Sequence, residues 1–186
     1  MARPRERRAA DDAAGGPHRP SAGGALTAGA PVAARIGPPL TDSFRHHTRL
    51  EVRFRDIDAF GHVNNASFVT YLEQARVRFL IDVLHVDVVQ SLPVILAALQ
   101  VDFRSPILFG DVVGIGTQVD WIGNSSLSMS HQMTARPEGA DAERVVAEAG
   151  TVLVAYDYDT ERPIRVPDAW RSAFASHEGR DLERPS

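Results

Sequence analysis

Residues 54–80 constrain the fold more than any other part of this sequence, because they join an extended stretch to a long amphipathic helix through a short polar turn. A helix is predicted over 65–84, with Asn64 or Asn65 as its N-cap. Four apolar residues recur at helical spacing and form one stripe along it: Phe68, Leu72, Ala75 and Phe79. Because Ala75 is small, a sheet can approach this stripe closely.

Apolar and charged residues alternate before that helix and predict a half-buried strand over 47–55, with Leu50, Val52 and Phe54 facing inward. Four further strands are predicted after the helix: 93–104, 112–122, 126–135 and 144–158. Gly123-Asn124 is typical of a hairpin turn. Several strands that follow one long helix favour an α+β fold with an antiparallel sheet.

The turn before the helix has the sequence D-x-D-x-x-G-H-V-N-N, from Asp56 to Asn65. It holds a carboxylate beside the positive end of the helix dipole, where free backbone N–H groups point outward. Such N–H groups polarise a carbonyl oxygen while a carboxylate attacks the carbonyl carbon or activates water. Asp58 is the candidate for this role. The alternative is a carboxylate that only shapes the turn or caps the helix.

This motif resembles that of the hotdog-fold thioesterases, in the branch typified by 4-hydroxybenzoyl-CoA thioesterase and its short-chain acyl-CoA relatives. The matching positions are Phe54, Asp56, Asp58, Gly61, His62, Val63, Asn64 and Asn65, followed on the helix by Tyr71, Glu73, Ala75 and Arg76. The resemblance spans roughly residues 46–174. It implies an antiparallel sheet wrapped around one long central helix, hydrolysis of an acyl-CoA thioester, and a homodimer or homotetramer with sites at the subunit interface.

By this resemblance Asp58 is the reacting carboxylate, as nucleophile or general base, and the helix start near Asn65 polarises the carbonyl. His62 is the third catalytic candidate: it orients Asp58, donates to the leaving group or only satisfies loop carbonyls. Asp56 is expected to support the turn through hydrogen bonds. Plant acyl-carrier-protein thioesterases have an asparagine where this chain has Phe60, so their mechanism is not carried over.

Substrate contacts are expected from five residues: Phe60, Gly61, Asn64, Phe68 and Arg104. The two phenylalanines would line a pocket for a fatty or aromatic acyl group, and the arginine would meet the nucleotide end of coenzyme A. The turn at 123–126 has no basic residue, so an acyl carrier protein stays an alternative carrier. A second hotdog branch places its catalytic glutamate on this helix. Here Glu73 is expected to pair with Arg76, at i+3, or with another arginine instead.

No separate cofactor is expected, because the coenzyme A thioester is itself the substrate. The chain has no cysteine and no H-E-x-x-H pattern, and His46-His47 lack a third ligand at suitable spacing, so no metal site is predicted. Two other functions are compatible with the fold: a non-catalytic module that binds acyl thioesters, and a dehydratase or hydratase.

Composition divides the chain into a hotdog domain over 44–175 and two tails, 1–43 and 176–186, that are predicted to be disordered. Residues 1–40 hold 23 Ala, Gly or Pro and no aromatic residue, which leaves little surface to bury. The domain is acidic, since the net charge is −4 although the first 40 residues are basic. Binding to nucleic acid is therefore not expected. No apolar run reaches the roughly 18 residues of a membrane span, and a cytoplasmic location is expected.

Overall fold

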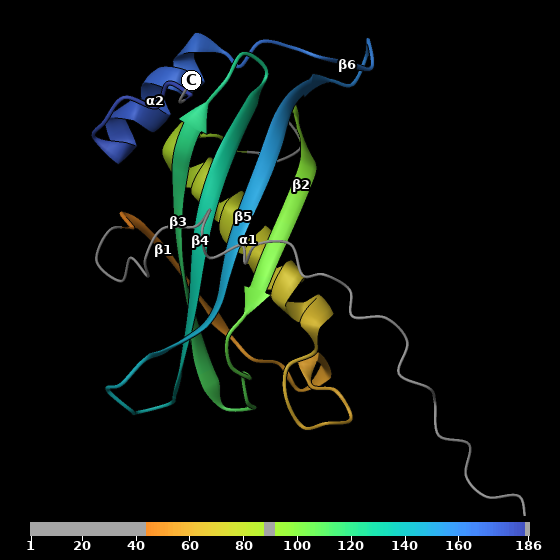
Figure 1. Cartoon of the computed structure of the whole chain (residues 1–186), viewed down its shortest axis with the longest axis vertical. Helices are drawn as coiled ribbons and strands as arrows, with labels where there is room; N and C mark the ends of the chain where they lie inside the picture. The colour runs from red at the N-terminus through yellow and green to blue at the C-terminus, as the bar shows by residue number, and fades with distance from the viewer. Residues whose placement is uncertain (1–43, 88–91, 185–186) are drawn as a thin grey trace, which may run out of the picture. The chain divides into compact units, whose positions relative to one another are not determined.

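The computed structural model describes residues 44–87 and 92–184. Its elements are β1 (His46–Glu51), the 3₁₀ turn η2 (Phe54–Asp56), α1 (Asn65–Leu84), β2 (Val94–Phe103), β3 (Asp111–Ile122), β4 (Ser126–Pro137), β5 (Arg144–Asp157), β6 (Arg162–Pro163) and α2 (Asp168–Glu178). The sheet is antiparallel with strand order β1-β3-β4-β5-β2, and β6 pairs with β5. It wraps around α1 (Figure 1), which is the expected α+β hotdog architecture.

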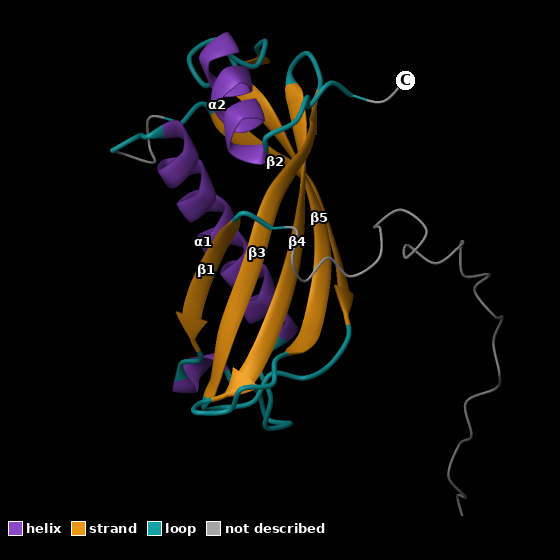
Figure 2. Ribbon diagram, turned by 90° about the vertical axis from the view of Figure 1, so that its left-hand side faces the viewer, coloured by secondary structure: helices purple, strands orange, loops and turns teal. Residues whose placement is uncertain are grey.

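Helix α1 lies against one face of the sheet, as Figure 2 shows from the side. It begins where predicted, because the Asn64 side chain accepts a hydrogen bond from the Ala66 amide (2.8 Å) and caps the helix. The predicted apolar stripe is confirmed, since all four of its side chains are at most 2% exposed: Phe68, Leu72, Ala75 and Phe79. The helix ends at His85, whose left-handed φ of 54° stops the helical hydrogen bonding.

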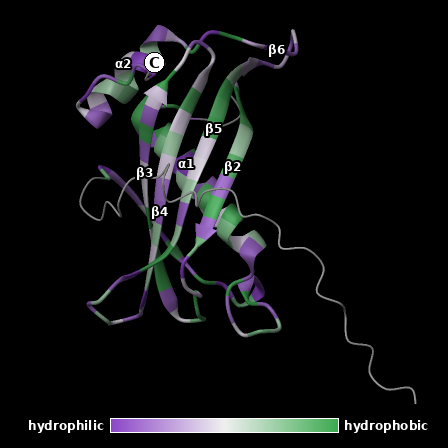
Figure 3. Ribbon diagram, in the orientation of Figure 1, coloured by the Kyte–Doolittle hydropathy of each residue, from purple (hydrophilic) through white to green (hydrophobic). Residues whose placement is uncertain are grey.

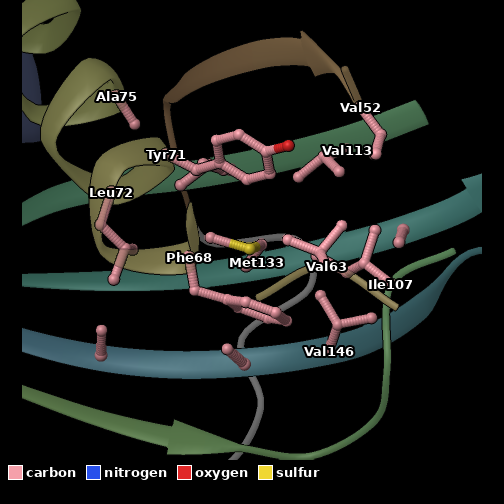
Figure 4. Close-up of a cluster of buried hydrophobic side chains, with 14 residues drawn as sticks. Val52, Val63, Phe68, Tyr71, Leu72, Ala75, Ile107, Val113, Met133 and Val146 are labelled. Atoms are coloured by element: carbon pink, nitrogen blue, oxygen red, sulfur yellow. The ribbon is translucent and has the colours of Figure 1, made fainter. Parts of the chain in front are cut away.

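The core beneath α1 consists of two apolar clusters. One surrounds Phe68 and Met133 and is drawn in Figure 4. The other surrounds Phe79 and Met129. Met129 and Met133 point to the same face of β4, and His131 lies between them on that face. A polar residue therefore separates the two clusters at the centre of the sheet.

His131 is held by the strands on both sides of β4. Its Nδ1 lies 3.1 Å from the Thr117 hydroxyl on β3, and its Nε2 lies 3.1 Å from the Thr151 hydroxyl on β5. All three side chains are at most 2% exposed. Burial lowers the pKa of His131 to about 3, and the positive charge of Arg76 contributes to this shift. The imidazole is therefore neutral at pH 7.

Strand β1 is shorter than predicted. It ends at Glu51, after which the chain turns through η2, and Phe54 is 83% exposed rather than directed inward. The cause is Asp56, whose carboxylate accepts a hydrogen bond from the Arg53 amide (3.0 Å) and closes the turn. A local hydrogen bond thus replaces the sheet pairing that the alternating pattern suggested.

The prediction of a disordered tail from residue 176 is wrong for 176–184. Helix α2 continues to Glu178, whose Oε1 accepts a hydrogen bond from the Val119 amide (2.9 Å). Beyond it, Leu182 is 3% exposed and Glu183 pairs with Ile122. The predicted extension over 1–43 lies outside the described residues. Among the helices that the structure describes, none is long and apolar enough to cross a membrane.

We expect His131 to make stability fall as the pH is lowered. Its folded pKa of about 3 lies below the unfolded value of about 6.5, so this contribution is fully present above pH 6.5 and is lost as the pH falls toward 3. Between pH 6 and 5 the free energy of unfolding, measured in urea, should fall by up to about 1.4 kcal/mol per pH unit.

The matched variant is His131→Asn, which keeps hydrogen-bonding groups but does not titrate. The free energy of unfolding of this variant should fall less steeply with decreasing pH than that of the wild type, although its absolute value will differ. Burial also lowers the pKa of His177, which adds a slope of the same sign in both proteins. Equal slopes for the two proteins would show that His131 is not the cause.

Candidate active site

The loop between η2 and α1 is folded tightly onto itself. Ile57 and Val63 form an isolated antiparallel bridge, and within it the Asp58 amide donates to the His62 carbonyl (2.9 Å). Gly61 turns the chain with a φ of 84°, a conformation that side-chain-bearing residues rarely adopt. This turn fixes the backbone on both sides of Asp58.

The same loop is anchored at its base by two backbone hydrogen bonds. The Asn64 amide donates to the Asp56 carbonyl (2.8 Å), and the Val63 amide donates to the Ile107 carbonyl (2.8 Å). Ile107 is fully buried. The loop is therefore tied both to η2 and to the segment that follows β2.

Asp56 occupies the buried side of this region, where it is 4% exposed. It accepts hydrogen bonds from the Tyr71 hydroxyl (2.6 Å) and from Nε of Arg53 (3.1 Å). Burial opposes ionisation of this carboxyl, but the hydrogen bonds from Arg53 and Tyr71 outweigh it and hold the pKa of Asp56 below its usual range. Burial and the hydrogen bond to Asp56 raise the pKa of Tyr71. These contacts agree with the structural role expected for Asp56.

Asp58 lies on the outer side of the loop, and its side chain is 18% exposed. One carboxylate oxygen accepts a hydrogen bond from the Phe60 amide (2.8 Å), and the other lies 3.5 Å from Nδ1 of His62. The same Nδ1 is 3.4 Å from the Val63 carbonyl oxygen. The Phe60 ring stacks on the imidazole, with 6.0 Å between the ring centres. The structure thus brings Asp58, Phe60 and His62 together, with Asp58 open to solvent.

The first turn of α1 leaves one amide available. The Ala66 amide donates to the Asn64 side chain (2.8 Å), and the Ser67 amide donates to the Asn64 carbonyl (2.8 Å). No acceptor for the Asn65 amide is found in the described part of the chain, as is usual for the first residue of a helix. The Asn64 amide donates to the Asp56 carbonyl, so it is not free to bond a substrate, although Asn64 was predicted to contact one.

Two predicted substrate contacts are placed differently. Phe68 is 2% exposed and packs edge to face on Phe103 (5.1 Å between ring centres), so it belongs to the core and not to the surface around Asp58. Arg104 donates to Glu148 (2.7 Å), so its charge is already balanced within the protomer. Phe60 and Gly61 are exposed, as a contact role requires.

An exposed apolar surface borders the Asp58 loop. We call it the aromatic rim and define it by five side chains that are 47–86% exposed: Phe54, Phe60, Phe103, Leu108 and Phe109. Phe54 and Phe109 meet edge to face at 6.2 Å. Sequence reasoning did not assign Phe103 or Phe109 to the site. The sequence feature that could have revealed them is the pair of phenylalanines flanking Ile107, which a hydrogen bond from the Val63 amide ties to the Asp58 loop.

The predicted pairing of Glu73 with Arg76 is wrong. No ion pair or hydrogen bond joins them, although the two lie three residues apart on α1. Glu73 is exposed whereas Arg76 is only 7% exposed. The spacing brings the backbone positions together, but the two side chains occupy different environments.

The arrangement around Asp58 suits addition to a carbonyl group. The positive end of the α1 dipole and the free Asn65 amide can stabilise negative charge on a carbonyl oxygen. The Asp58 carboxylate, on the turn that leads into α1, can attack the carbonyl carbon or take a proton from water. Within residues 44–87 and 92–184, no group of three or more His, Asp or Glu side chains is placed to hold a metal ion.

Comparison with known proteins agrees with this geometry. Residues 52–174 match the model of the thioesterase-like superfamily. A thioesterase from Thermus thermophilus, solved in complex with coenzyme A and Zn, is 38% identical, with a TM-score of 0.67 over 76% of this chain and 99% of that one. The long-chain acyl-CoA thioesterase FadM of Escherichia coli is 28% identical over 63% of this chain and 87% of its own length.

A more distant structure shows the same fold. The 4-hydroxybenzoyl-CoA thioesterase from Pseudomonas sp. strain CBS-3 is 18% identical, with a TM-score of 0.62 over 69% of this chain and 97% of that one. The resemblance that the motif around Asp58 suggested is therefore confirmed at the level of fold, and the 38% identical thioesterase confirms it at the level of sequence.

We expect Asp56→Asn to lower the free energy of unfolding by about 1–3 kcal/mol, because a buried, multiply hydrogen-bonded carboxylate loses an acceptor. Urea denaturation measures this change. The matched control is Asp58→Asn, at a partly exposed site where the amide can keep the hydrogen bond from the Phe60 amide. The control should change stability by less than about 1 kcal/mol. Equal losses in the two variants would contradict the division of roles.

Proposed function

The chain belongs to the thioesterase-like superfamily, and from that premise we propose that it hydrolyses an acyl-CoA thioester to a free acid and coenzyme A. One arrangement carries the proposal: the partly exposed Asp58 carboxylate is held on a hydrogen-bonded turn that leads directly into α1, whose first amide, at Asn65, is free. A non-catalytic binding module has no need of an ionisable carboxylate at this position.

In the proposed reaction the thioester carbonyl oxygen accepts a hydrogen bond from the Asn65 amide, and the α1 dipole stabilises the negative charge that develops there. Asp58 then acts in one of two ways. It attacks the carbonyl carbon and forms an anhydride that water hydrolyses, or it removes a proton from the water that attacks. In both routes the carbon–sulfur bond breaks and the thiolate takes up a proton. Trapping of an acyl group on Asp58 would establish the first route.

His62 is proposed to orient the reacting carboxylate. Its Nδ1 is 3.5 Å from Asp58, and its ring is stacked on Phe60. The imidazole is partly exposed and can also donate a proton to the departing thiolate.

The aromatic rim supports a fatty or aromatic acyl group as the substrate. Phe60 belongs to the loop that carries Asp58, and the other four side chains come from the turn before it and from residues 103–109; exposed apolar surface commonly marks a binding site. The E. coli relative acts on long-chain acyl-CoA and the T. thermophilus relative binds coenzyme A, which favours coenzyme A as the carrier. An acyl carrier protein is the alternative carrier, because Arg104 is already paired with Glu148.

We also propose that two or more copies assemble along β2. This strand is an edge of the sheet and contains no fully buried residue, although its sequence VILAALQVDF is mostly apolar. Figure 3 shows the hydrophobic character of its first half. Such an edge offers free N–H and C=O groups to another strand. Because Phe103 at its end belongs to the aromatic rim, a second copy on this edge would also border the Asp58 loop.

The assembly should therefore be a dimer or larger at assay concentrations, as light scattering measures. A charge placed on the exposed face of β2, as in Leu96→Glu, should both separate the copies and lower kcat/KM. The matched control is Val69→Glu, which adds the same charge at an exposed apolar position on α1. An active monomer would contradict a site completed by two copies.

Asp58→Asn should lower kcat by at least about 10²–10⁴-fold, because the amide cannot act as base or carboxylate nucleophile. The KM of a substrate acyl-CoA should change little, since the size of the side chain and its hydrogen bond from the Phe60 amide are kept. Thiol release from acyl-CoAs of varied chain length and aromaticity measures the effect. If the variant keeps more than about a tenth of the wild-type kcat, Asp58 is not the reacting group and Glu73 is the next carboxylate to test.

A further inference from the structure

Arg76, midway along α1, is buried without a matching charge. Its side chain is 7% exposed, and no carboxylate of the described residues lies within ion-pair distance of it. Burial lowers the pKa of its guanidinium, and the negative charge of Glu73 only partly opposes this. An arginine in such surroundings destabilises the fold unless an anion joins it.

Arg76 also lines a hollow of about 400 Å³ between α1, the edge strand β2 and the end of β5. This volume lies within the range of small-molecule sites. The other walls are mainly aliphatic, and they include Leu80, Leu92, Val94, Leu96 and Leu153. Tyr158 closes one side, and its hydroxyl donates to the Val94 carbonyl (2.9 Å). Arg76 is therefore the one cation in a lining that is mainly aliphatic and also includes Glu73.

We propose that this hollow binds a carboxylate carried on an aliphatic chain, with the carboxylate paired to Arg76 and the chain lying on the leucines. A guanidinium matches a carboxylate with two parallel hydrogen bonds. Glu73, the other charged residue of the lining, is exposed to solvent, so Arg76 is the buried charge with which a ligand carboxylate would pair. A phosphate group would bring more negative charge than one arginine offsets in the presence of Glu73.

The hollow differs from the region around Asp58 of the same protomer. Arg76 follows Asn65 by eleven residues, which places it about 16 Å along the helix. The inference rests on the proposed function in one respect, because an aliphatic carboxylate is the product of that reaction. Two sources are possible: the free acid, or a carboxylate at the far end of the acyl group of the substrate.

The test measures binding of decanoate by calorimetry, with neutral 1-decanol as the comparison ligand. Decanoate should bind wild type saturably, and Arg76→Met should weaken its binding by at least about tenfold, as expected for the loss of a charge-assisted hydrogen bond. Arg76→Lys keeps the positive charge but loses the planar guanidinium that makes two parallel hydrogen bonds, so it should give an intermediate affinity. Binding of 1-decanol should be the same in wild type and Arg76→Met.

The matched control is Arg78→Gln, which removes an exposed arginine of the same helix that pairs with Asp82. It should bind decanoate like wild type. Without ligand, Arg76→Met should melt at the same or a higher temperature, because a buried unpaired charge is gone. Decanoate binding that is absent from wild type or unchanged in Arg76→Met would overturn the proposal. Unfolding or a changed oligomeric mass of Arg76→Met would also overturn it, because Arg76 would then already be paired within the assembly.

Kinetics separate the two sources. If Arg76→Met relieves inhibition of decanoyl-CoA hydrolysis by added decanoate, the ligand is the free product. If it lowers kcat/KM only for the ω-carboxyl analogue of decanoyl-CoA, the ligand is the far end of the substrate. The binding experiment is repeated with Asp58→Asn, which should bind decanoate like wild type. A protein that binds decanoate but hydrolyses no thioester would refute the proposed function and leave this site intact.

Discussion

The position of the Asp58 loop depends on one buried carboxylate. The Asp56 carboxylate accepts a hydrogen bond from the Tyr71 hydroxyl in the second turn of α1. It also accepts hydrogen bonds from the guanidinium and the amide of Arg53, in the chain after β1. It therefore joins the end of an edge strand to a helix across the loop between them. If this link is lost, only backbone hydrogen bonds remain to hold the loop that carries Asp58: those within it and the one from the Val63 amide to the Ile107 carbonyl.

The sequence predicted the parts of the structure that depend on local pattern. The apolar stripe from Phe68 to Phe79 has helical period, and its burial follows from that period alone. The N-cap at Asn64 is likewise a local property, because the side chain bonds an amide two residues away. The long strands after the helix were found for the same reason, since alternation and turn residues mark their limits.

The failed predictions depend on contacts that a periodic pattern does not encode. Phe54 continues the alternating pattern of β1, yet a hydrogen bond from Arg53 to Asp56 turns it outward. The tail after residue 176 has weak local signals, and it is ordered by Leu182 and by the hydrogen bond between Glu178 and Val119. Arg76 looked like the partner of Glu73 because helical spacing shows which residues neighbour each other but not which of them a sheet covers.

The open edge at β2 has a consequence for the protein as it is synthesised. A protomer that has folded but not yet met another copy presents a long apolar strand with unpaired backbone groups. Strands of this kind template intermolecular β-structure, although the irregular β2–β5 pairing between Leu96 and Ala98 interrupts the regular edge. In the assembly proposed along β2, correct pairing would compete with aggregation, so dilution would favour unassembled chains and crowding of nascent chains would favour mispairing.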